Sequence, residues 1–370
     1  MSQTAQSSPA PKEAHRFPCP QCGADYRFEP RQSKLVCDHC GHEEATEQGD
    51  RTTAITELDF KQALTDQLPG AEVIETRISI CPNCAAHITF DADVHAMECA
   101  FCATPVVTDT GTHRLIKPRA VLPFQLAERD AHEAMNNWLG KLWLAPNGIQ
   151  KYARKGRKMD GIYVPYWTYD ADTKSSFSGE RGTVYYVTKT VMQDGKKVQK
   201  QVQRIRWTPV SGQVSRWFDD VLVLASKALP KAYTDALEPW NLSALEPYTP
   251  EYLAGYQAEG YTITLQDGYD EARGHMDNVI RRDVAFKIGG DRQRVHQVAT
   301  IVSDVTFKHV LLPVWMAAYK YRGKSYRFVV NGQTGRVCGE RPWSAWKITF
   351  VVILGAIVAT GIGYIIAMNQ

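Results

Sequence analysis

Eight of the nine cysteines in this chain fall into two blocks of identical spacing. Each block is a C-x2-C pair, a spacer of fourteen residues and a second C-x2-C pair. A C-x2-C pair places two thiolates on one tight turn, and two such turns that face each other form a tetrahedral S4 site for one metal ion. The candidate ligands are Cys19, Cys22, Cys37 and Cys40 in the first block, and Cys81, Cys84, Cys99 and Cys102 in the second.

Thiolate ligands in tetrahedral geometry favour zinc over magnesium or calcium. Neither block is long enough to bury a core of its own, so metal binding would supply its folding free energy. The alternatives are a disulfide framework, an iron–sulfur site and a redox C-x-x-C motif. Two copies of one spacing favour structural zinc. The sequence therefore predicts two Zn2+ ions per chain and a reducing compartment, the cytoplasm.

The residues that follow the cysteine pairs differ between the two blocks. Gly23 and Gly41 follow the pairs of the first block, where the turn favours a positive φ angle. Ala85 and Ala103 occupy the same places in the second block. Because a side chain disfavours that conformation, we expect the turns of the second block to be slightly more strained.

The composition is that of an ordinary folded protein, with 44% hydrophobic and 22% charged residues among 370. This length is enough for two or three domains. The net charge of +3 is lower than is usual for a dedicated nucleic-acid binder, so composition does not favour such a partner. Residues 1–14 are rich in Ser, Ala, Gln and Pro and contain no apolar run. They predict a disordered tail, not a signal peptide.

The positions of the cysteine blocks divide the chain. We expect zinc ribbons at residues 15–46 and 77–108, separated by a linker, 47–76, with a short amphipathic helix that ends at Pro69-Gly70. Residues 112–342 mix helical and strand patterns and predict one domain with a mainly antiparallel sheet. The predicted fold class is therefore α+β.

Within residues 112–342, the periodicity predicts a helix from Ala127 to Leu142 and a helix passing into a strand over Asp270–Ile288. Strands are expected at Gly161–Tyr169, Thr183–Met192, Val198–Thr208, Gln297–Lys308 and Leu311–Tyr321, the second and third joined by an Asp194-Gly195 turn. Val164-Pro-Tyr-Trp167 and Leu312-Pro-Val-Trp315 are similar to each other, which suggests two half-repeats that each begin a strand.

The C-terminal segment 347–369 is predicted to be a transmembrane helix. Residues 348–368 carry no charge, and a helix of that length spans about 30 Å, the thickness of the hydrocarbon core. The alternative is a buried core helix. Trp343 and Trp346 suit a membrane interface, and Arg341 and Lys347 flank only the preceding side.

This charge asymmetry predicts a single-pass, tail-anchored protein of the cytoplasmic membrane, with residues 1–347 in the cytoplasm. Gly355, Ala359 and Gly363 recur every four residues on one face of the predicted span. Small residues at this spacing allow two helices to approach closely, so this face predicts a homo-oligomer.

Several other motifs are weak. Asp170 and Asp172 could bring two carboxylates together, but we expect exposed aspartates at the end of a strand. Gly323-Lys324-Ser325 is similar to the end of a phosphate-binding loop, but its flanks indicate a hairpin. The basic run Lys151–Lys158 suits either a solvated loop or a contact with anionic lipid or nucleic acid. Cys338 fits a buried small residue. No catalytic constellation is found, so the sequence predicts a protein that is not an enzyme.

Each cysteine block resembles the zinc ribbons of the transcription-factor-IIB type and rubredoxin-like knuckles. Together with the strand Tyr163–Asp170, the turn Asn331–Gly335 and the terminal span, the blocks resemble the bacterial membrane-anchored proteins with transcription-factor-IIB-type zinc ribbons. Some members of that family are mislabelled as primosomal helicases, but this chain lacks the nucleotide site of a helicase. The resemblance implies flotillin-like membrane proteins and envelope-stress machinery as partners.

The favoured function is a non-enzymatic scaffold on the cytoplasmic face of the membrane, with the ribbons docking protein partners. The alternative is a membrane-tethered nucleic-acid binder that uses the same ribbons, and an enzyme in the α+β domain is a third. The second ribbon carries Asp91, Asp93 and Glu98 but no Lys or Arg between Ile80 and Val107. Because nucleic-acid affinity depends on cationic contacts to phosphate, this acidic ribbon favours a protein partner.

Overall fold

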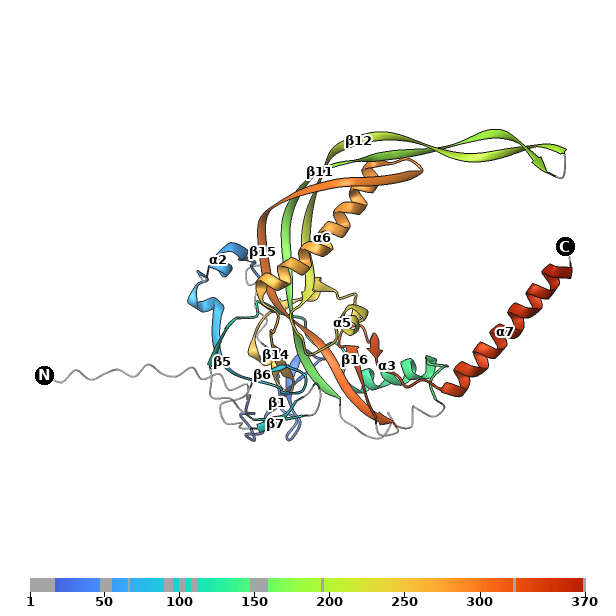
Figure 1. Ribbon diagram of the computed structural model, residues 1–370. Coiled ribbons are helices and arrows are strands. Elements are labelled where there is room, and N and C mark those ends of the chain that lie inside the picture. Colours follow the sequence, from blue (N-terminus) through green and yellow to red (C-terminus); the bar gives the residue numbers. More distant parts are fainter. Residues whose placement is uncertain are drawn as a thin grey trace.

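The computed structural model has a large, mainly antiparallel sheet, helices packed on it, and a long helix that projects at the C-terminal end (Figure 1). This arrangement confirms the predicted α+β class. The structure describes residues 17–46, 55–65, 67–89, 96–99, 101, 104–107, 112–146, 159–193, 196–321 and 324–368.

Three very long strands form the centre of the sheet, namely β11 (Asp160–Gln193), β12 (Lys196–Leu224) and β15 (Arg292–Tyr321). β11 lies between the other two and is antiparallel to both. The predicted division of β15 into two strands, at Lys308 and Leu311, is wrong. The polar pair Lys308-His309 suggests an interruption, but both side chains are buried within the continuous strand.

The remaining strands extend this sheet or form two small ones. The large sheet also contains β4 (Leu58–Asp59), β5 (Val73–Ile80), β6 (His87–Thr89), β9 (Thr112–Ile116), β10 (Ala120–Val121), β13 (Glu246–Pro247), β14 (Gln257–Gly260), β16 (Lys324–Asn331) and β17 (Val337–Gly339). The small sheets are β1 (Tyr26–Glu29), β2 (Lys34–Cys37) and β3 (Glu43–Ala45), and the pair β7 (Ala96–Glu98) and β8 (Pro105–Val107).

The two proline motifs lie inside long strands, so their expected place at the start of a strand is wrong. They pair with each other across β11 and β15, where Val164 is opposite Leu312 and Pro165 is opposite Leu311. Proline lacks an N–H group, but the carbonyl of Pro165 still accepts a hydrogen bond from the N–H of Ala225. The similarity between the motifs therefore marks one paired region of the sheet.

Helix α6 (Leu265–Ile288) lies along the sheet (Figure 1). It begins at the N-cap Thr264 and ends at Gly289, whose φ of 68° terminates the helix. The predicted passage into a strand within this segment is wrong. Buried residues recur at helical spacing along its whole length: Leu265, Gly268, Ala272, Met276, Ile280, Val284 and Ile288.

The other helices are shorter, apart from the terminal one. Helix α3 (Glu128–Lys141) confirms the helix predicted from Ala127 to Leu142, and these two residues are its caps. The predicted linker contains a short helix, α2 (Phe60–Leu64). The others are α5 (Lys231–Leu237), the 3-10 helices η1 (Gly70–Glu72), η2 (Leu242–Ala244) and η3 (Pro250–Leu253), and α7 (Ala345–Met368).

Near the start of β11, neighbouring side chains belong to different buried clusters, as expected for the two faces of a strand. Tyr163 belongs to a cluster that includes Cys19 and Cys37 of the first block. The neighbouring Ile162 belongs to a cluster that includes Cys81 of the second block. The two cysteine blocks are therefore packed against opposite faces of the same central strands.

Candidate metal centre and a buried ionic cluster

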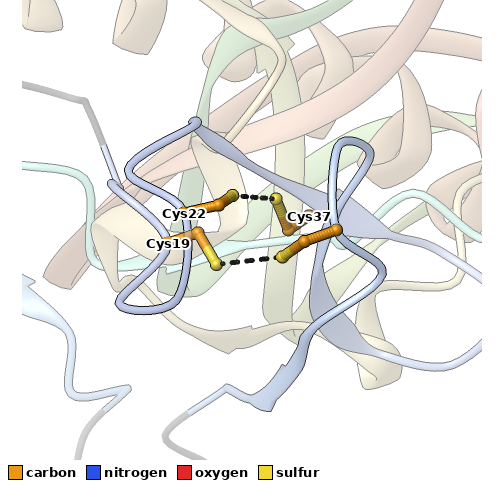
Figure 2. A group of neighbouring side chains, drawn as sticks. Cys19, Cys22 and Cys37 are labelled. Atoms are coloured by element: carbon orange, nitrogen blue, oxygen red, sulfur yellow. Dashed lines mark hydrogen bonds between the residues drawn. The ribbon is translucent and has the colours of Figure 1, made fainter.

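The four cysteines of the first block meet at one point in the first cysteine module (residues 17–46). The Sγ atoms of Cys19 and Cys40 lie 3.5 Å apart, as do those of Cys22 and Cys37 (Figure 2). All four sulfur atoms lie within 4.8 Å of one another, and the thiols are free. A tetrahedral site with metal–sulfur bonds of about 2.3 Å would separate its sulfurs by about 3.8 Å. The module can therefore hold one metal ion.

Two tight turns position these thiols. Gly23 and Gly41 have φ angles of 75° and 74°, and each N–H donates to the carbonyl of the first cysteine of its pair. In the second block Ala85 adopts a φ of 58°, and its N–H donates to the carbonyl of Cys81. A non-glycine residue in this conformation is strained. The greater strain predicted for the second block is therefore confirmed at Ala85.

Backbone N–H groups favour the thiolate form at part of this site. Burial raises the pKa of Cys19, but the N–H groups of Gln21 and Cys22, together with the thiols of Cys40 and Cys22, outweigh it and lower the pKa to about 6. The N–H of His42 lowers the pKa of Cys40, but burial and the neighbouring thiols raise it to about 12. The lowered pKa of Cys19 favours the thiolate form that a metal ion requires, and a bound ion would deprotonate the other thiols.

The first module is attached to the body through its buried side. The N–H of Phe28 donates to the carbonyl of Ala254, at 3.0 Å, and its ring contacts that of Tyr252. Cys19 and Cys37 are buried with this ring cluster, whereas Cys22 and Cys40 are exposed. The candidate metal centre therefore has one side buried against the body and the other side exposed to solvent.

The second cysteine module (residues 73–107) brings together three of its four predicted ligands. Cys81, Cys84 and Cys99 each place a sulfur within 4.8 Å of the others, and the Sγ atoms of Cys84 and Cys99 lie 3.5 Å apart. Cys102 lies outside the described residues. Unlike the first module, this one is continuous with the large sheet, because β6 pairs with both β5 and β14.

A buried carboxyl group supports the junction between the second module and the body. Glu259, in β14, is opposite Ile88 of β6 and is only 4% exposed. Its Oε1 accepts a hydrogen bond from the hydroxyl of Ser226, at 2.7 Å. Burial raises the pKa of Glu259 to about 8, and the Ser226 hydroxyl opposes this only in part.

Glu259→Gln is expected to stabilise the protein at pH 9 and to leave stability nearly unchanged at pH 5. The folded state prefers a protonated Glu259, so the wild type loses stability as the pH rises from about 4.5 to about 8. The Gln variant avoids this loss, so its free energy of unfolding at pH 9 should exceed that of the wild type by a few kcal/mol at most. This estimate takes roughly 1.4 kcal/mol for each unit by which the pKa is raised. Thermal unfolding of the full chain in detergent, at pH 5 and pH 9, measures the difference. Glu133→Gln, on the exposed face of α3, is the matched control, and an equal effect of both variants would contradict the prediction.

Sequence reasoning missed a buried ionic cluster. Asp170 is not an exposed aspartate at a strand end, as predicted, but lies in the middle of β11 and is 1% exposed. The register of β11 shifts beside it, which identifies a β-bulge. Asp172, by contrast, is exposed as predicted.

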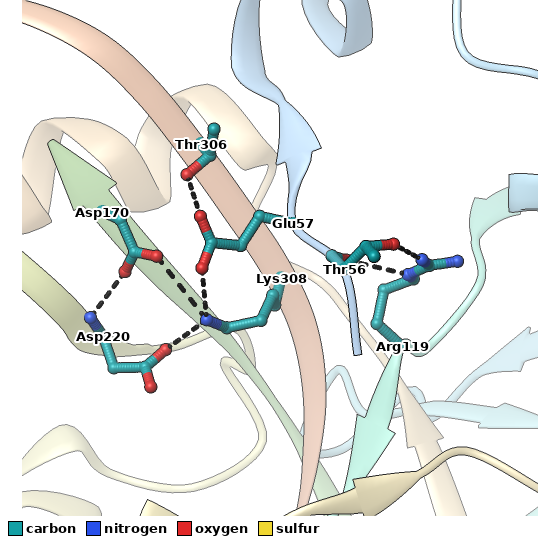
Figure 3. A network of polar contacts seen from close by, with 7 residues as sticks. All are labelled: Thr56, Glu57, Arg119, Asp170, Asp220, Thr306 and Lys308. Atoms are coloured by element: carbon teal, nitrogen blue, oxygen red, sulfur yellow. Dashed lines mark hydrogen bonds and ion pairs between the residues drawn. The ribbon is translucent and has the colours of Figure 1, made fainter. Parts of the chain in front are cut away.

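Lys308 of β15 lies at the centre of this cluster (Figure 3). Its Nζ lies 2.8 Å from Asp220, 3.1 Å from Glu57 and 3.6 Å from Asp170. Thr306 also donates its hydroxyl to Glu57, and the N–H of Asp220 donates to Asp170. The cluster therefore ties three strands and the segment before α2 to one lysine.

One ammonium group cannot neutralise the negative charges of three ionised carboxyl groups. Burial and the hydrogen bond to Glu57 raise the pKa of Asp170 to about 7. The contact with Asp170, together with Thr306 and Lys308, lowers the pKa of Glu57 to about 2. Asp170, Asp219 and Asp220 could also approach a cation, but the Lys308 ammonium already lies among these oxygens. The arrangement is therefore best explained as structural.

The other predicted motifs have plain outcomes. Tyr321 pairs with Lys324, so β15 and β16 form the hairpin expected around Gly323-Lys324-Ser325. Cys338 lies partly buried in β17, and burial raises its pKa. The basic run Lys151–Lys158 lies outside the described residues.

Comparison with known proteins identifies a relative along most of the chain. The uncharacterized protein YdjG of Bacillus subtilis (strain 168) is 25% identical over 333 residues, which cover 90% of this chain and 91% of YdjG. No family model matches the chain. No solved structure matches it either.

Proposed function

We propose that this protein is a non-enzymatic adaptor, anchored in the cytoplasmic membrane by α7, whose two cysteine modules are zinc ribbons that dock protein partners. Zinc is proposed because all the donors are thiols in a four-sulfur arrangement, which suits Zn2+ in structural sites. Each ribbon would bind one ion, and Cys102 would complete the second site.

The proposal of a protein partner rests on the ion pairing of the basic side chains in the first module. Its described residues contain three basic side chains, Arg27, Arg31 and Lys34, and each is paired with a carboxylate. Arg27 binds Asp38 through two nitrogen atoms. Cations engaged in this way are not free to bind phosphate, so the surface suits a protein partner better than nucleic acid.

Helix α7 supports the anchor. Its segment Ala345–Tyr364, of 20 residues, is long and apolar enough to cross a membrane. None of these residues is buried against the body. A core helix, the alternative considered for this segment, would be buried. Near its start, Lys347 donates to the carbonyls of Trp143 and Ala145, and Arg341 lies over the ring of Trp343. Such basic and aromatic residues suit the cytoplasmic interface.

The proposed partners follow from the family resemblance and from the free surface of α7. Flotillin-like or envelope-stress membrane proteins are the expected class for the ribbons. No side chain lies within 4 Å of the Cβ positions that Gly355 or Gly363 would have, so this face of the span is open to a second helix. Self-association through Gly355, Ala359 and Gly363 is therefore part of the proposal.

A photo-crosslinking amino acid on the first module tests the adaptor function. Placed at Lys34, which is half-buried on β2, or at Glu43, which is exposed on β3, it should give the same protein adduct in intact membranes from both positions. The matched position Glu133, exposed on α3, should not give that adduct. An adduct that is sensitive to nuclease would instead favour the membrane-tethered nucleic-acid binder, and no shared adduct would contradict the adaptor.

A further inference from the structure

The hairpin of β11 and β12 extends well beyond the rest of the sheet. The last pair between β11 and β15 is Gly182 with Arg292, whereas β11 and β12 remain paired from Thr183 with Arg206 to Gln193 with Lys196. We call residues 183–206 the β-arm. Eleven residue pairs at about 3.3 Å each make it roughly 35 Å long. Figure 1 shows the arm and α7 projecting to the same side of the molecule.

The two faces of the β-arm differ in charge. Residues opposite each other in an antiparallel pair share a face, and successive pairs alternate between faces. Among the described side chains, one face, the basic face, holds four cations and no carboxylate, while the other face holds no cation. The described part of the basic face consists of the pairs Thr183/Arg206, Tyr185/Arg204, Val187/Val202 and Lys189/Lys200, followed by Val191.

The cations of the basic face have no carboxylate partners in the described part of the chain. Lys189, Lys200, Arg204 and Arg206 are exposed, and the described ion pairs of the neighbouring sheet involve Arg216 and Arg294 instead. Arg206 lies 5.7 Å from the centre of the Tyr185 ring. The arm therefore differs from the first module, whose described cations are all neutralised.

This arrangement costs stability in the free protein. Lys189 and Lys200 are directly opposite each other, and like charges in such a pair repel. A two-stranded hairpin without a covered face is also only marginally stable by itself. Binding of an anionic surface to the basic face would relieve the repulsion and cover the valines and tyrosine between the cations.

We propose that the basic face of the β-arm binds anionic lipid headgroups of the membrane in which α7 is anchored. The inference rests on the proposed anchor, which keeps the arm close to a bilayer. Cations interleaved with valine and tyrosine suit the headgroup region, where aromatic and aliphatic side chains enter the boundary and lysines meet phosphate. Each Lys or Arg near an anionic bilayer strengthens binding roughly fivefold, so several acting together make a stable contact.

Hydrogen–deuterium exchange of the full chain in nanodiscs tests this inference. Amide exchange in residues 183–193 and 196–206 should be at least tenfold slower in phosphatidylcholine nanodiscs containing 30% phosphatidylglycerol than in phosphatidylcholine alone. The protection should disappear in 0.5 M NaCl, because salt screens the attraction.

The variant that decides the question replaces Lys189, Lys200, Arg204 and Arg206 by Gln. It should exchange like the wild type in phosphatidylcholine, which shows that the arm still folds, and should gain no protection from phosphatidylglycerol. The matched control replaces four exposed cations elsewhere by Gln and should keep the protection: Lys227, Arg281, Arg282 and Lys287.

The outcomes separate this inference from the proposed anchor. A chain that is not retained in either nanodisc would overturn the anchor and the inference with it. A retained chain whose arm exchanges equally in both lipids would overturn the lipid contact alone. Protection of the arm by duplex DNA in phosphatidylcholine nanodiscs, with none from phosphatidylglycerol, would assign the basic face to nucleic acid instead.

Discussion

Replacing Cys37 by Ser is expected to reduce the bound zinc from about two equivalents per chain to about one and to unfold the first module. The Sγ atom of Cys37 contacts that of Cys22, and the residue is buried against the body. A serine hydroxyl is a poor substitute for a soft thiolate ligand. Structural zinc supplies about 10–16 kcal/mol in isolated zinc-finger peptides, so the three-stranded sheet of this module should not persist without its ion. Elemental analysis of the purified full chain measures the change.

Two control variants sharpen the experiment. Cys338→Ser, outside both modules, should retain two equivalents of zinc. Cys81→Ser should lose one equivalent and leave the first module folded, since the two modules lie on opposite faces of the central strands. Two equivalents in Cys37→Ser, or iron in the wild type, would contradict the paired zinc sites.

The cysteine modules are the part that the sequence predicts best, because the information is local. A C-x2-C pair largely determines its own turn, and Gly23 and Gly41 mark the positive φ that the turn needs. The alternation that places Ile162 and Tyr163 in different clusters is also local. What spacing alone does not reveal is that the second module joins the large sheet through β6, because that pairing with β14 depends on residues about 170 positions apart.

The long strands and the ionic cluster are predicted less well, because both depend on distant partners. Ser175 and Gly179 suggest from their residue types that a strand ends between them, but both lie within β11. Ser175 is buried, and its hydroxyl forms a hydrogen bond with that of Thr300. From the sequence alone Asp170 is expected to be exposed, because its contacts with Lys308 and Asp220 form only in the folded sheet. The sequence contains one indication of the cluster: Lys308 and His309 lie between Phe307 and an apolar run that begins at Val310, where an unpaired charge would be costly.

Lys308→Met is expected to destabilise the protein by about 3–5 kcal/mol at pH 8, the range for breaking a buried ion pair. The change leaves Glu57, Asp170 and Asp220 close together without their shared cation. The loss should be smaller at pH 5. In the wild type the pKa of Asp170 is raised to about 7 although Lys308 lowers it, so removing the lysine raises this pKa further. Asp170 is therefore protonated in both proteins at pH 5, whereas at pH 8 the variant must either bind a proton or keep a carboxylate without its cation. Denaturant unfolding of the full chain at both pH values measures the effect.

Adding Asp170→Asn to Lys308→Met should recover part of the lost stability, because it removes the carboxyl group that the lysine no longer balances. The matched control is Lys174→Met. Lys174 is exposed on β11, four residues after Asp170, and its replacement should change the free energy of unfolding by less than about 0.5 kcal/mol. Equal effects of the Lys174 and Lys308 variants would show that the cluster contributes no ionic stabilisation. An undiminished loss in the double variant would show that Lys308 acts through packing of its aliphatic chain and not through Asp170.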